Sequence, residues 1–463
     1  MRFILSLLTA ACVPTLLASS AAAQIGPSET GGSTILPHWV SKNVLVILLD
    51  DVGVDQLSVY GMGSDLPATP NIDRLASGGV LFENVWSNPV CSPTRATLVT
   101  GRYVFRNGVG HTVSFGGFPL DLDEITLPEL LDDVGGGVYS HAAFGKWHLG
   151  DSSVGGDLAP NLAGFDHFSG VLQNVQNYYI YPKTENGLTM WNLGYQTSDM
   201  VDDFLRWEKQ QGAPWMAYMA FNAPHYPWTA PPPNLHTVDL ENAPPPSVDA
   251  RPYYKAMIEA ADHEIGRMLA NMQGTLEDTT IIFLADNGTP PEVVVPPFDN
   301  QKAKATLYEG GVRVPMIVAG AAVERPGRRE RALVNSSDLF ATIAELSGAG
   351  LPSSWPHGYT VDSVSFVPYL LSGSAAPQRD YVFAEIFTPG GFGPYLLEAR
   401  AVRDERYKLI ESSLDPDPIY GNRFFDLWTD PFEQNDLLGQ PLSPEQLDAY
   451  NRLNRQLQLI LQS

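Results

Sequence analysis

The sequence predicts an α/β protein with a large central, mostly parallel sheet flanked by helices, followed by a smaller C-terminal α+β domain built on a short antiparallel sheet. A continuous apolar run at 44–49 is typical of a central strand that is buried on both faces. A similar run lies at 281–284. Near the C-terminus, the segments RAVRDERYKLIE and RFFDLW are typical of strands in a small antiparallel sheet.

The N-terminus has the features of a signal peptide, which we assign to residues 1–23. Arg2 precedes an apolar run at 3–17, and the small residues at 21–23 form an A-x-A cleavage site. Cleavage before Gln24 predicts a mature chain that is soluble in a periplasm or outside the cell.

Two membrane-anchored alternatives fit this N-terminus less well. A transmembrane anchor is disfavoured because the apolar run is too short to span a bilayer and contains Pro14. A lipid anchor on Cys12 is disfavoured because the third residue before it is Thr9 instead of the usual leucine. No later stretch is apolar enough to span a membrane, so we expect a periplasmic or secreted protein.

Length and charge limit the architecture and the partners. The chain has 463 residues, 44% of them hydrophobic, which is enough for one large domain at 24–374 and a smaller C-terminal domain at 375–463. Its formal net charge of -24 repels nucleic acid and anionic membranes. An anionic substrate would therefore need a local basic site.

Carboxylate and amide side chains follow the two apolar runs. Asp50 and Asp51 come directly after the first, and Asp286 and Asn287 come after the second. In open α/β sheets the ligand site lies outside the carboxyl ends of the strands. Each pair alone is typical of an ordinary turn. Together they form an oxygen-only set that suits Ca²⁺ or Mg²⁺ better than zinc or copper.

Cationic and titratable side chains follow two further predicted strands. Lys146 and His148 come after a strand near 138–143, and His225 comes after one near 215–221. These residues are the local positive groups that an anionic substrate would need on an acidic protein.

Cys91 is the only cysteine that remains after the leader. Pro93 suits the first turn of a helix that continues to Gly101, so the thiol lies at a helix N-terminus, where free amides favour an anion. Arg95 is one turn further on. The position suits a nucleophile or an anion site, and a small buried hydrophobe is the plain structural alternative.

Two more helices complete the expected elements. The spacing of apolar residues predicts an amphipathic helix at 255–273 that ends at Gly274. The capping box at 443–446 predicts a final helix. Its expected buried face consists of Leu447, Tyr450, Leu453, Leu457 and Ile460.

The segment CSPTRATLVTGR, residues 91–102, resembles the signature of the type I sulfatases, in the alkaline phosphatase superfamily. Other segments similar to those of this family occur in the family's order across nearly the whole mature chain: LLDDVG, TPNIDRLASGGVLFENVWS, GKWHLG, FNAPHYP, ADNG, KATLYEGGVRVP, RDERYKLIE and FDLWTDPFEQNDLL. The resemblance implies an alkaline-phosphatase-like fold, with the catalytic domain at 24–374.

The resemblance implies that Cys91 is oxidised to formylglycine by a maturation enzyme, and that the hydrate of this aldehyde attacks sulfur. It implies one divalent ion, usually calcium with magnesium possible, held by the modified Cys91 together with Asp50, Asp51, Asp286 and Asn287. The implied substrate is a small sulfate ester, and the implied activity is that of an arylsulfatase-type sulfuric ester hydrolase.

The resemblance also implies roles for the cationic residues. Arg95 would steady the hydrate. Sulfate binding and leaving-group protonation would fall to Lys146, His148, His225 and Lys304, with His225 the favoured general acid.

Two alternatives stay open at this point. A phosphodiester or phosphonate monoester hydrolase of the same superfamily can share the nucleophile and the metal, and a silent sulfatase-like protein would only bind sulfated ligands. The pocket walls are expected to come from loops at 104–120, 171–197 and 223–252, and His111 lies close enough after the helix to line the pocket. The sequence predicts no particular oligomeric state.

Overall fold

The computed structural model describes residues 40–115, 117–212, 214–272, 274–417 and 419–463. The described residues from 40 onward belong to one compact unit. The predicted signal peptide at 1–23 lies outside the described residues. The predicted domain boundary at 374/375 falls between helix α10 (Val367–Leu371) and strand β11 (Val382–Thr388) and stays a prediction.

The main element is a sheet of ten strands among the described residues, in the order β10-β2-β9-β8-β1-β7-β3-β4-β5-β6. Its strands are β1 (Asn43–Leu49), β2 (Gly79–Trp86), β3 (Ser140–Lys146), β4 (His167–Val171), β5 (Ile180–Glu185), β6 (Leu188–Leu193), β7 (Trp215–Ala220), β8 (Thr279–Ala285), β9 (Met316–Gly320) and β10 (Arg328–Asn335). The mostly parallel α/β sheet is therefore confirmed.

The central strands run in one direction. β1 pairs in parallel with both β7 and β8, and β3 pairs in parallel with β7. β2 is antiparallel to β9, which is antiparallel to β8, so β2 also shares the direction of β8. Every residue of β1, β7 and β8 is buried, as expected for strands covered on both faces. The carboxyl ends of these strands therefore meet at one edge of the sheet.

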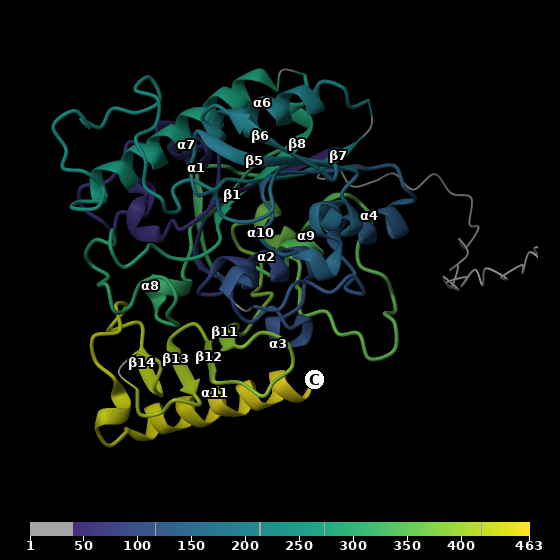
Figure 1. Ribbon diagram of the computed structural model, residues 1–463. Helices are drawn as coiled ribbons and strands as arrows, with labels where there is room; N and C mark the ends of the chain where they lie inside the picture. The colour runs from purple at the N-terminus through teal and green to yellow at the C-terminus, as the bar shows by residue number, and fades with distance from the viewer. Residues whose placement is uncertain (1–39, 116, 213, 273, 418) are drawn as a thin grey trace, which may run out of the picture. The chain divides into compact units, whose positions relative to one another are not determined.

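Helices cover both faces of this sheet. Figure 1 shows α1 (Pro70–Ser77), α6 (Gln196–Glu208) and α7 (Arg251–Asn271) on one face. The opposite face carries α2 (Cys91–Thr100), α4 (Leu127–Gly135), α9 (Asp338–Leu346) and α10. Three further helices, α3 (Val104–Asn107), α5 (Ala159–Leu162) and α8 (Glu309–Val312), are single turns in the connections.

The smaller sheet is antiparallel, as predicted. Its order is β11-β12-β13-β14, with β12 (Leu397–Arg403), β13 (Tyr407–Ser412) and β14 (Arg423–Asp426). Helix α11 (Pro444–Gln462) packs against it and begins at the predicted capping box, in which Ser443 and Gln446 bond reciprocally. Leu453, Leu457 and Ile460 are buried as expected.

One expected core position of α11 is wrong. Leu447 is 50% exposed, and Tyr450 is only partly buried, whereas Ala449 takes a buried position. Among the described residues, the cluster that α11 forms with the small sheet includes Ala449, Leu453, Leu457 and Ile460 but not Leu447.

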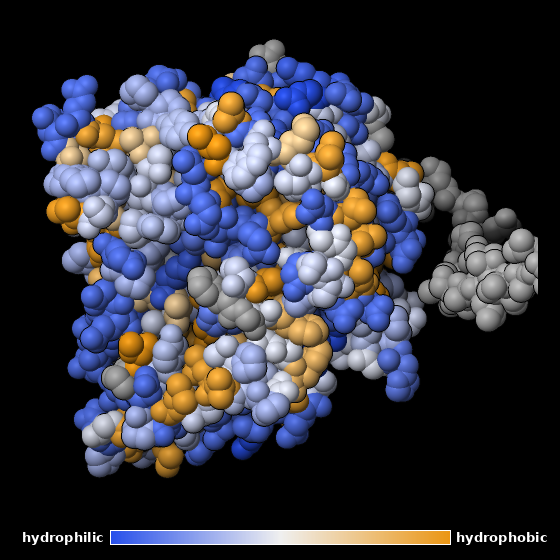
Figure 2. Space-filling model, in the orientation of Figure 1, coloured by the Kyte–Doolittle hydropathy of each residue, from blue (hydrophilic) through white to orange (hydrophobic). Residues whose placement is uncertain are grey.

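Most of the apolar residues are buried, and the surface visible in Figure 2 is mainly hydrophilic. Figure 2 shows a face on which hydrophilic side chains predominate and hydrophobic ones form small groups. Among the described residues, no helix is both long and apolar enough to cross a membrane.

Buried charges join the two sheets. Lys408 on β13 is 0% exposed and lies 2.7 Å from Glu433 and 3.3 Å from Glu309 of α8. Arg403 on β12 lies 3.1 Å from the other oxygen of Glu309, and Trp86 Nε1 donates to the same carboxylate at 3.0 Å. Burial raises the pKa of Glu309, but the Arg403 and Lys408 charges outweigh it and the pKa is lowered.

We predict that Lys408→Met lowers the free energy of unfolding by about 3 kcal/mol, because removing one partner leaves a buried charge uncompensated. Chemical denaturation would measure it. Arg452→Ala is the control: Arg452 is exposed and pairs with Asp404 and Asp448, so its loss should cost at most about 0.5 kcal/mol. Equal costs for the two variants would contradict the proposed role of the buried network.

Candidate functional site

Four adjacent parallel strands deliver the predicted site residues to one sheet edge. Asp50 and Asp51 follow β1, Asp286 and Asn287 follow β8, and Lys146 is the last residue of β3. The segments after β3 and β7 supply His148 and His225, and Lys304 comes from the irregular connection between β8 and α8. The structure brings together every residue that the sequence analysis singled out.

Three buried carboxylates meet three cations at this edge. Arg95 lies 2.8 Å from Asp286 and 3.3 Å from Asp50, and its Nη1 donates to the carbonyl of Lys146 at 2.8 Å. Lys146 pairs with Asp50. Each charge therefore has an opposite charge beside it, as groups buried this deeply require.

A fourth ion pair and two polar contacts tie the carboxylates to each other. Lys304 pairs with Asp51. The backbone N–H of Asp51 donates to Asp286 Oδ1 at 3.1 Å, and Asn287 Nδ2 donates to Asp51 Oδ1 at 2.7 Å. The ends of β1 and β8 are thus joined by side chains as well as by the sheet.

The backbone at this edge is unusual. Asp51 has φ 69° and His148 has φ 60°, in the left-handed region that non-glycine residues seldom adopt. Tyr254 Oη donates to the carbonyl of Asp51 at 2.6 Å. Such strain persists only where surrounding contacts enforce it, and it is concentrated at functional sites.

Electrostatics differ between the carboxyl groups. Burial raises the pKa of Asp50, but Lys146 and the other nearby cations outweigh it and hold the pKa well below its usual range. Burial raises the pKa of Asp51 and, with the Asp50 charge, that of Asp286. Three adjacent carboxylates cannot all ionise freely, so the cluster favours an added cation.

Cys91 is the first residue of α2 and is buried, and no other cysteine occurs among the described residues. Its Sγ lies 3.3 Å from Asp50 Oδ1 and 3.7 Å from Lys304 Nζ. Burial and the Asp286 and Asp50 charges raise the pKa of the thiol well above its usual value. A reactive thiolate needs the opposite shift, so the unmodified thiol is poorly suited to act as the nucleophile.

The two histidines have different surroundings. His225 Nδ1 donates to the carbonyl of Tyr226 at 2.6 Å, which directs Nε2 toward Asp51 Oδ2 at 3.8 Å. Burial and the Lys146 charge lower the pKa of His225 to about 3. His148 is fully buried, with Nε2 3.2 Å from Ser114 Oγ, and burial lowers its pKa well below the usual value.

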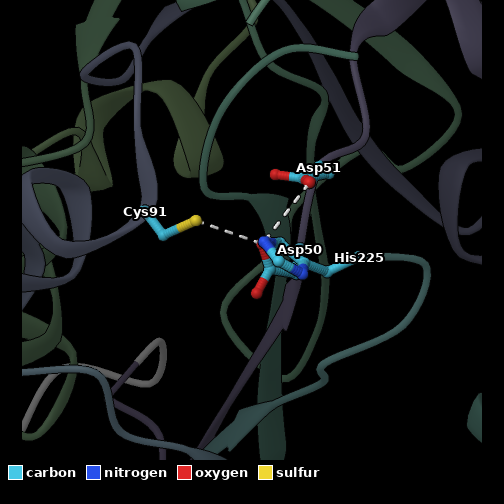
Figure 3. Close-up of side chains that lie close together, drawn as sticks. All are labelled: Asp50, Asp51, Cys91 and His225. Atoms are coloured by element: carbon cyan, nitrogen blue, oxygen red, sulfur yellow. Dashed lines mark hydrogen bonds and ion pairs between the residues drawn. The ribbon is translucent and has the colours of Figure 1, made fainter. Parts of the chain in front are cut away.

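The site includes a group that could hold a metal ion. One atom from each of Asp50, Asp51, Cys91 and His225 lies within 4.8 Å of the other three. Figure 3 shows these side chains pointing toward one another, with Cys91 approaching from a different segment. Asn287 Oδ1 is buried without a hydrogen-bond partner. A hard cation would satisfy this oxygen and offset the carboxylate repulsion, so the residues fit such an ion.

A cavity of about 400 Å³ opens over Cys91. Cys91, His225 and Lys304 face it, and its walls come from all three predicted segments. The segment at 171–197 is not a loop throughout, because β5 and β6 form a hairpin within it. The prediction that His111 lines the pocket is confirmed. Sequence reasoning missed Thr112, Asn174, Gln176 and Tyr226 as lining residues, because they belong to loops without periodic patterns.

Sequence models of known families match most of the chain. The model described as "Sulfatase" matches residues 42–349, and the one described as "N-sulphoglucosamine sulphohydrolase, C-terminal" matches residues 300–462.

Known proteins resemble the chain over similar lengths. Bovine (Bos taurus) arylsulfatase A is 30% identical, with 89% of this chain and 86% of the relative covered. Human (Homo sapiens) N-acetylgalactosamine-6-sulfatase is 30% identical over 72% of this chain and 66% of the relative.

Solved structures agree with this relationship. The PsFucS1 sulfatase from Pseudoalteromonas sp. is 26% identical, with a TM-score of 0.66 and 86% of each chain covered. A structure solved in complex with D-glucosamine-2-N,6-O-disulfate shares the fold, with a TM-score of 0.74, 20% identity and coverage of 91% of this chain and 99% of that one. The chain therefore belongs to the sulfatase family and is a sulfuric ester hydrolase.

Proposed function

We propose that the chain hydrolyses small sulfate esters with a formylglycine made from Cys91 and a divalent ion, Ca²⁺ or Mg²⁺, held beside it. The observation that carries this proposal is the position of Cys91 Sγ, which lies between Asp50 and Lys304 and faces the cavity. Aldehyde formation would need a maturation enzyme, and a signal peptide at 1–23 would carry the chain to a periplasm or outside the cell.

In the reaction proposed by family resemblance, one hydroxyl of the aldehyde hydrate attacks sulfur, and the S–O bond to the alcohol breaks. The alcohol oxygen takes up a proton as it leaves. The other hydroxyl then loses its proton, sulfate is expelled and the aldehyde returns. Arg95 is fully buried and bonded to two carboxylates, and it would hold the hydrate in place.

Lys146 and Lys304 are suited to bind the sulfate oxygens. Both ammonium groups rest on carboxylates that we propose as metal ligands. When bound, the ion would polarise a sulfate oxygen as a Lewis acid. Asp50, Asp51, Asp286 and Asn287 would hold it together with the modified Cys91, which would leave the two ammonium groups free for the substrate.

Proton transfer to the alcohol requires a donor in the cavity. We propose His225, whose ring orientation is fixed by the Tyr226 carbonyl. Because its pKa in the free site is about 3, His225 must gain its proton in the substrate complex. Lys304 is the competing donor, because nearby carboxylates, Asp51 first, raise its pKa despite burial and keep it protonated.

We predict that Cys91→Ala lowers kcat/KM for 4-nitrophenyl sulfate by at least about 1000-fold, because the nucleophile is removed. Its thermal unfolding should resemble that of the native protein. The mass of the peptide carrying residue 91, taken from active protein of the native source, should correspond to the aldehyde or its hydrate. Full activity with an intact thiol would exclude the proposed nucleophile.

Metal removal should lower both activity and stability. Chelation should abolish hydrolysis, and Ca²⁺ at 100 times its dissociation constant should restore it and add about 2.7 kcal/mol to the free energy of unfolding. Asp51→Asn should lose most of this added stability, whereas Asp239→Asn, an exposed change outside the site, should keep it. A melting curve of the native protein that does not respond to Ca²⁺ or Mg²⁺ would contradict the proposed ion.

Leaving-group dependence identifies the proton donor. His225→Gln should lower kcat/KM for an alkyl sulfate by at least about 100-fold, but much less for 4-nitrophenyl sulfate, whose leaving group needs little protonation. If Lys304→Met instead shows the larger loss on the alkyl sulfate and His225→Gln loses equally on both substrates, Lys304 is the residue that protonates the leaving alcohol. Native activity on a phosphate diester serves as a comparison, and a strong preference for the diester would contradict the proposal that small sulfate esters are the substrates.

A further inference from the structure

A second cavity, of about 540 Å³, lies next to the catalytic one. Tyr226 lines both cavities. Its carbonyl also accepts the hydrogen bond that orients His225. The other residues that line the second cavity are Pro227, Trp228, Pro246, Ser247, Val248, Asp249, Ala250 and Glu292.

Aromatic and apolar residues make up most of the wall of this cavity, and Trp228 connects it to the protein interior. Tyr226 is 61% exposed and meets Trp228 edge to face, with ring centroids 5.6 Å apart. Trp228 packs against the main hydrophobic core. Two contacts hold the following residues: Thr229 N–H donates to Met257 Sδ at 3.4 Å, and Tyr179 Oη donates to the carbonyl of Ala230 at 2.8 Å. An aromatic ring held against the core, as Trp228 is, can bind a substrate ring at low entropic cost.

The charge of the second cavity is opposite to that of the first. Its charged lining residues are Asp249 and Glu292, both exposed, and none of the described residues that line it is Lys, Arg or His. Asp249 Oδ1 accepts a hydrogen bond from the backbone N–H of Arg251 at 3.1 Å. Ionised carboxylates only accept hydrogen bonds, so they match hydroxyl donors and repel a second sulfate.

We propose that this second cavity binds a neutral, hydroxylated ring of the alcohol part of the substrate. The substrate is then a saccharide of at least two rings that carries its sulfate on the ring in the catalytic cavity and no sulfate on the ring beyond Tyr226. This inference rests on the proposed sulfatase function and narrows it to a substrate class.

The test compares three substrates with the native enzyme: 4-nitrophenyl sulfate, a neutral disaccharide with one sulfate, and the same disaccharide with a second sulfate on the distal ring. We expect kcat/KM for the singly sulfated disaccharide to exceed that for the doubly sulfated one by at least about tenfold, because like charges are excluded. Equal values would overturn the proposal. Failure to hydrolyse any of the three would instead count against the proposed function.

Charge-changing variants test whether the preference for the singly sulfated disaccharide arises in the second cavity. Glu292→Lys should reduce the preference for the singly sulfated disaccharide by about tenfold, because it places a cation beside the distal ring. Glu241→Lys is the matched control: Glu241 lies in the loop at 223–252 that supplies most of this cavity's wall, is exposed and lines neither cavity, so the preference should stay within about twofold of the native value. Equal effects of the two lysines would show a general field and overturn the assignment.

Stacking provides an independent measurement. Trp228→Ala should lower kcat/KM for the singly sulfated disaccharide about tenfold relative to 4-nitrophenyl sulfate, mainly through KM, because an aromatic wall is removed. Two outcomes would overturn the proposal. One is an unchanged ratio between the two substrates. The other is a larger loss on a bulky hydrocarbon sulfate than on the disaccharide together with no effect of Glu292→Lys, which would indicate a hydrocarbon ring.

Discussion

The burial of three carboxylates at one sheet edge is the constraint on which the rest of the structure depends. Asp50, Asp51 and Asp286 are almost completely excluded from water, and such groups are stable only when each is paired or bound to a cation. The counter-charges come from distant parts of the chain: Arg95 from α2, Lys146 from β3 and Lys304 from the segment before α8. These ion pairs therefore fix the positions of a helix, a strand and a long connection relative to the ends of β1 and β8.

Much of this arrangement could be predicted from the sequence, because the positions of the central strands indicate which residues lie at the edge of the sheet. Buried apolar runs predict central strands, and the carboxyl ends of parallel strands share an edge. The residues after β1, β8, β3 and β7 could therefore be expected to meet, and they do. The helix that begins at Cys91 was predictable in the same way, because Pro93 and Gly101 mark its two ends. Lys304 had no such signal, and only the family resemblance pointed to it.

Other features could not be predicted because they depend on tertiary contacts that leave no period in the sequence. The edge hairpin of β5 and β6 is exposed along most of β6, so it lacks the alternation that marks a half-buried strand. The buried position of Glu309 depends on Arg403 and Lys408, nearly one hundred residues away. Cavity walls at Thr112 and Gln176 come from irregular loops whose paths are set by packing.

The distribution of charge explains how an acidic protein can act on an anion. The net charge of -24 opposes an anionic substrate at long range, and this repulsion is screened within about 10 Å at 0.1 M salt. Inside the catalytic cavity, Lys304 and the groups beneath it act at contact distance in a partly buried site, where charges interact more strongly. With the proposed divalent ion added to the three cations and three carboxylates beneath the cavity, an acidic surface around a locally positive site would favour a single compact anionic group. In a polysulfated chain, the acidic surface would repel every sulfate group that lies outside the cavity. A substrate with one sulfate on an otherwise neutral molecule would have no such further group.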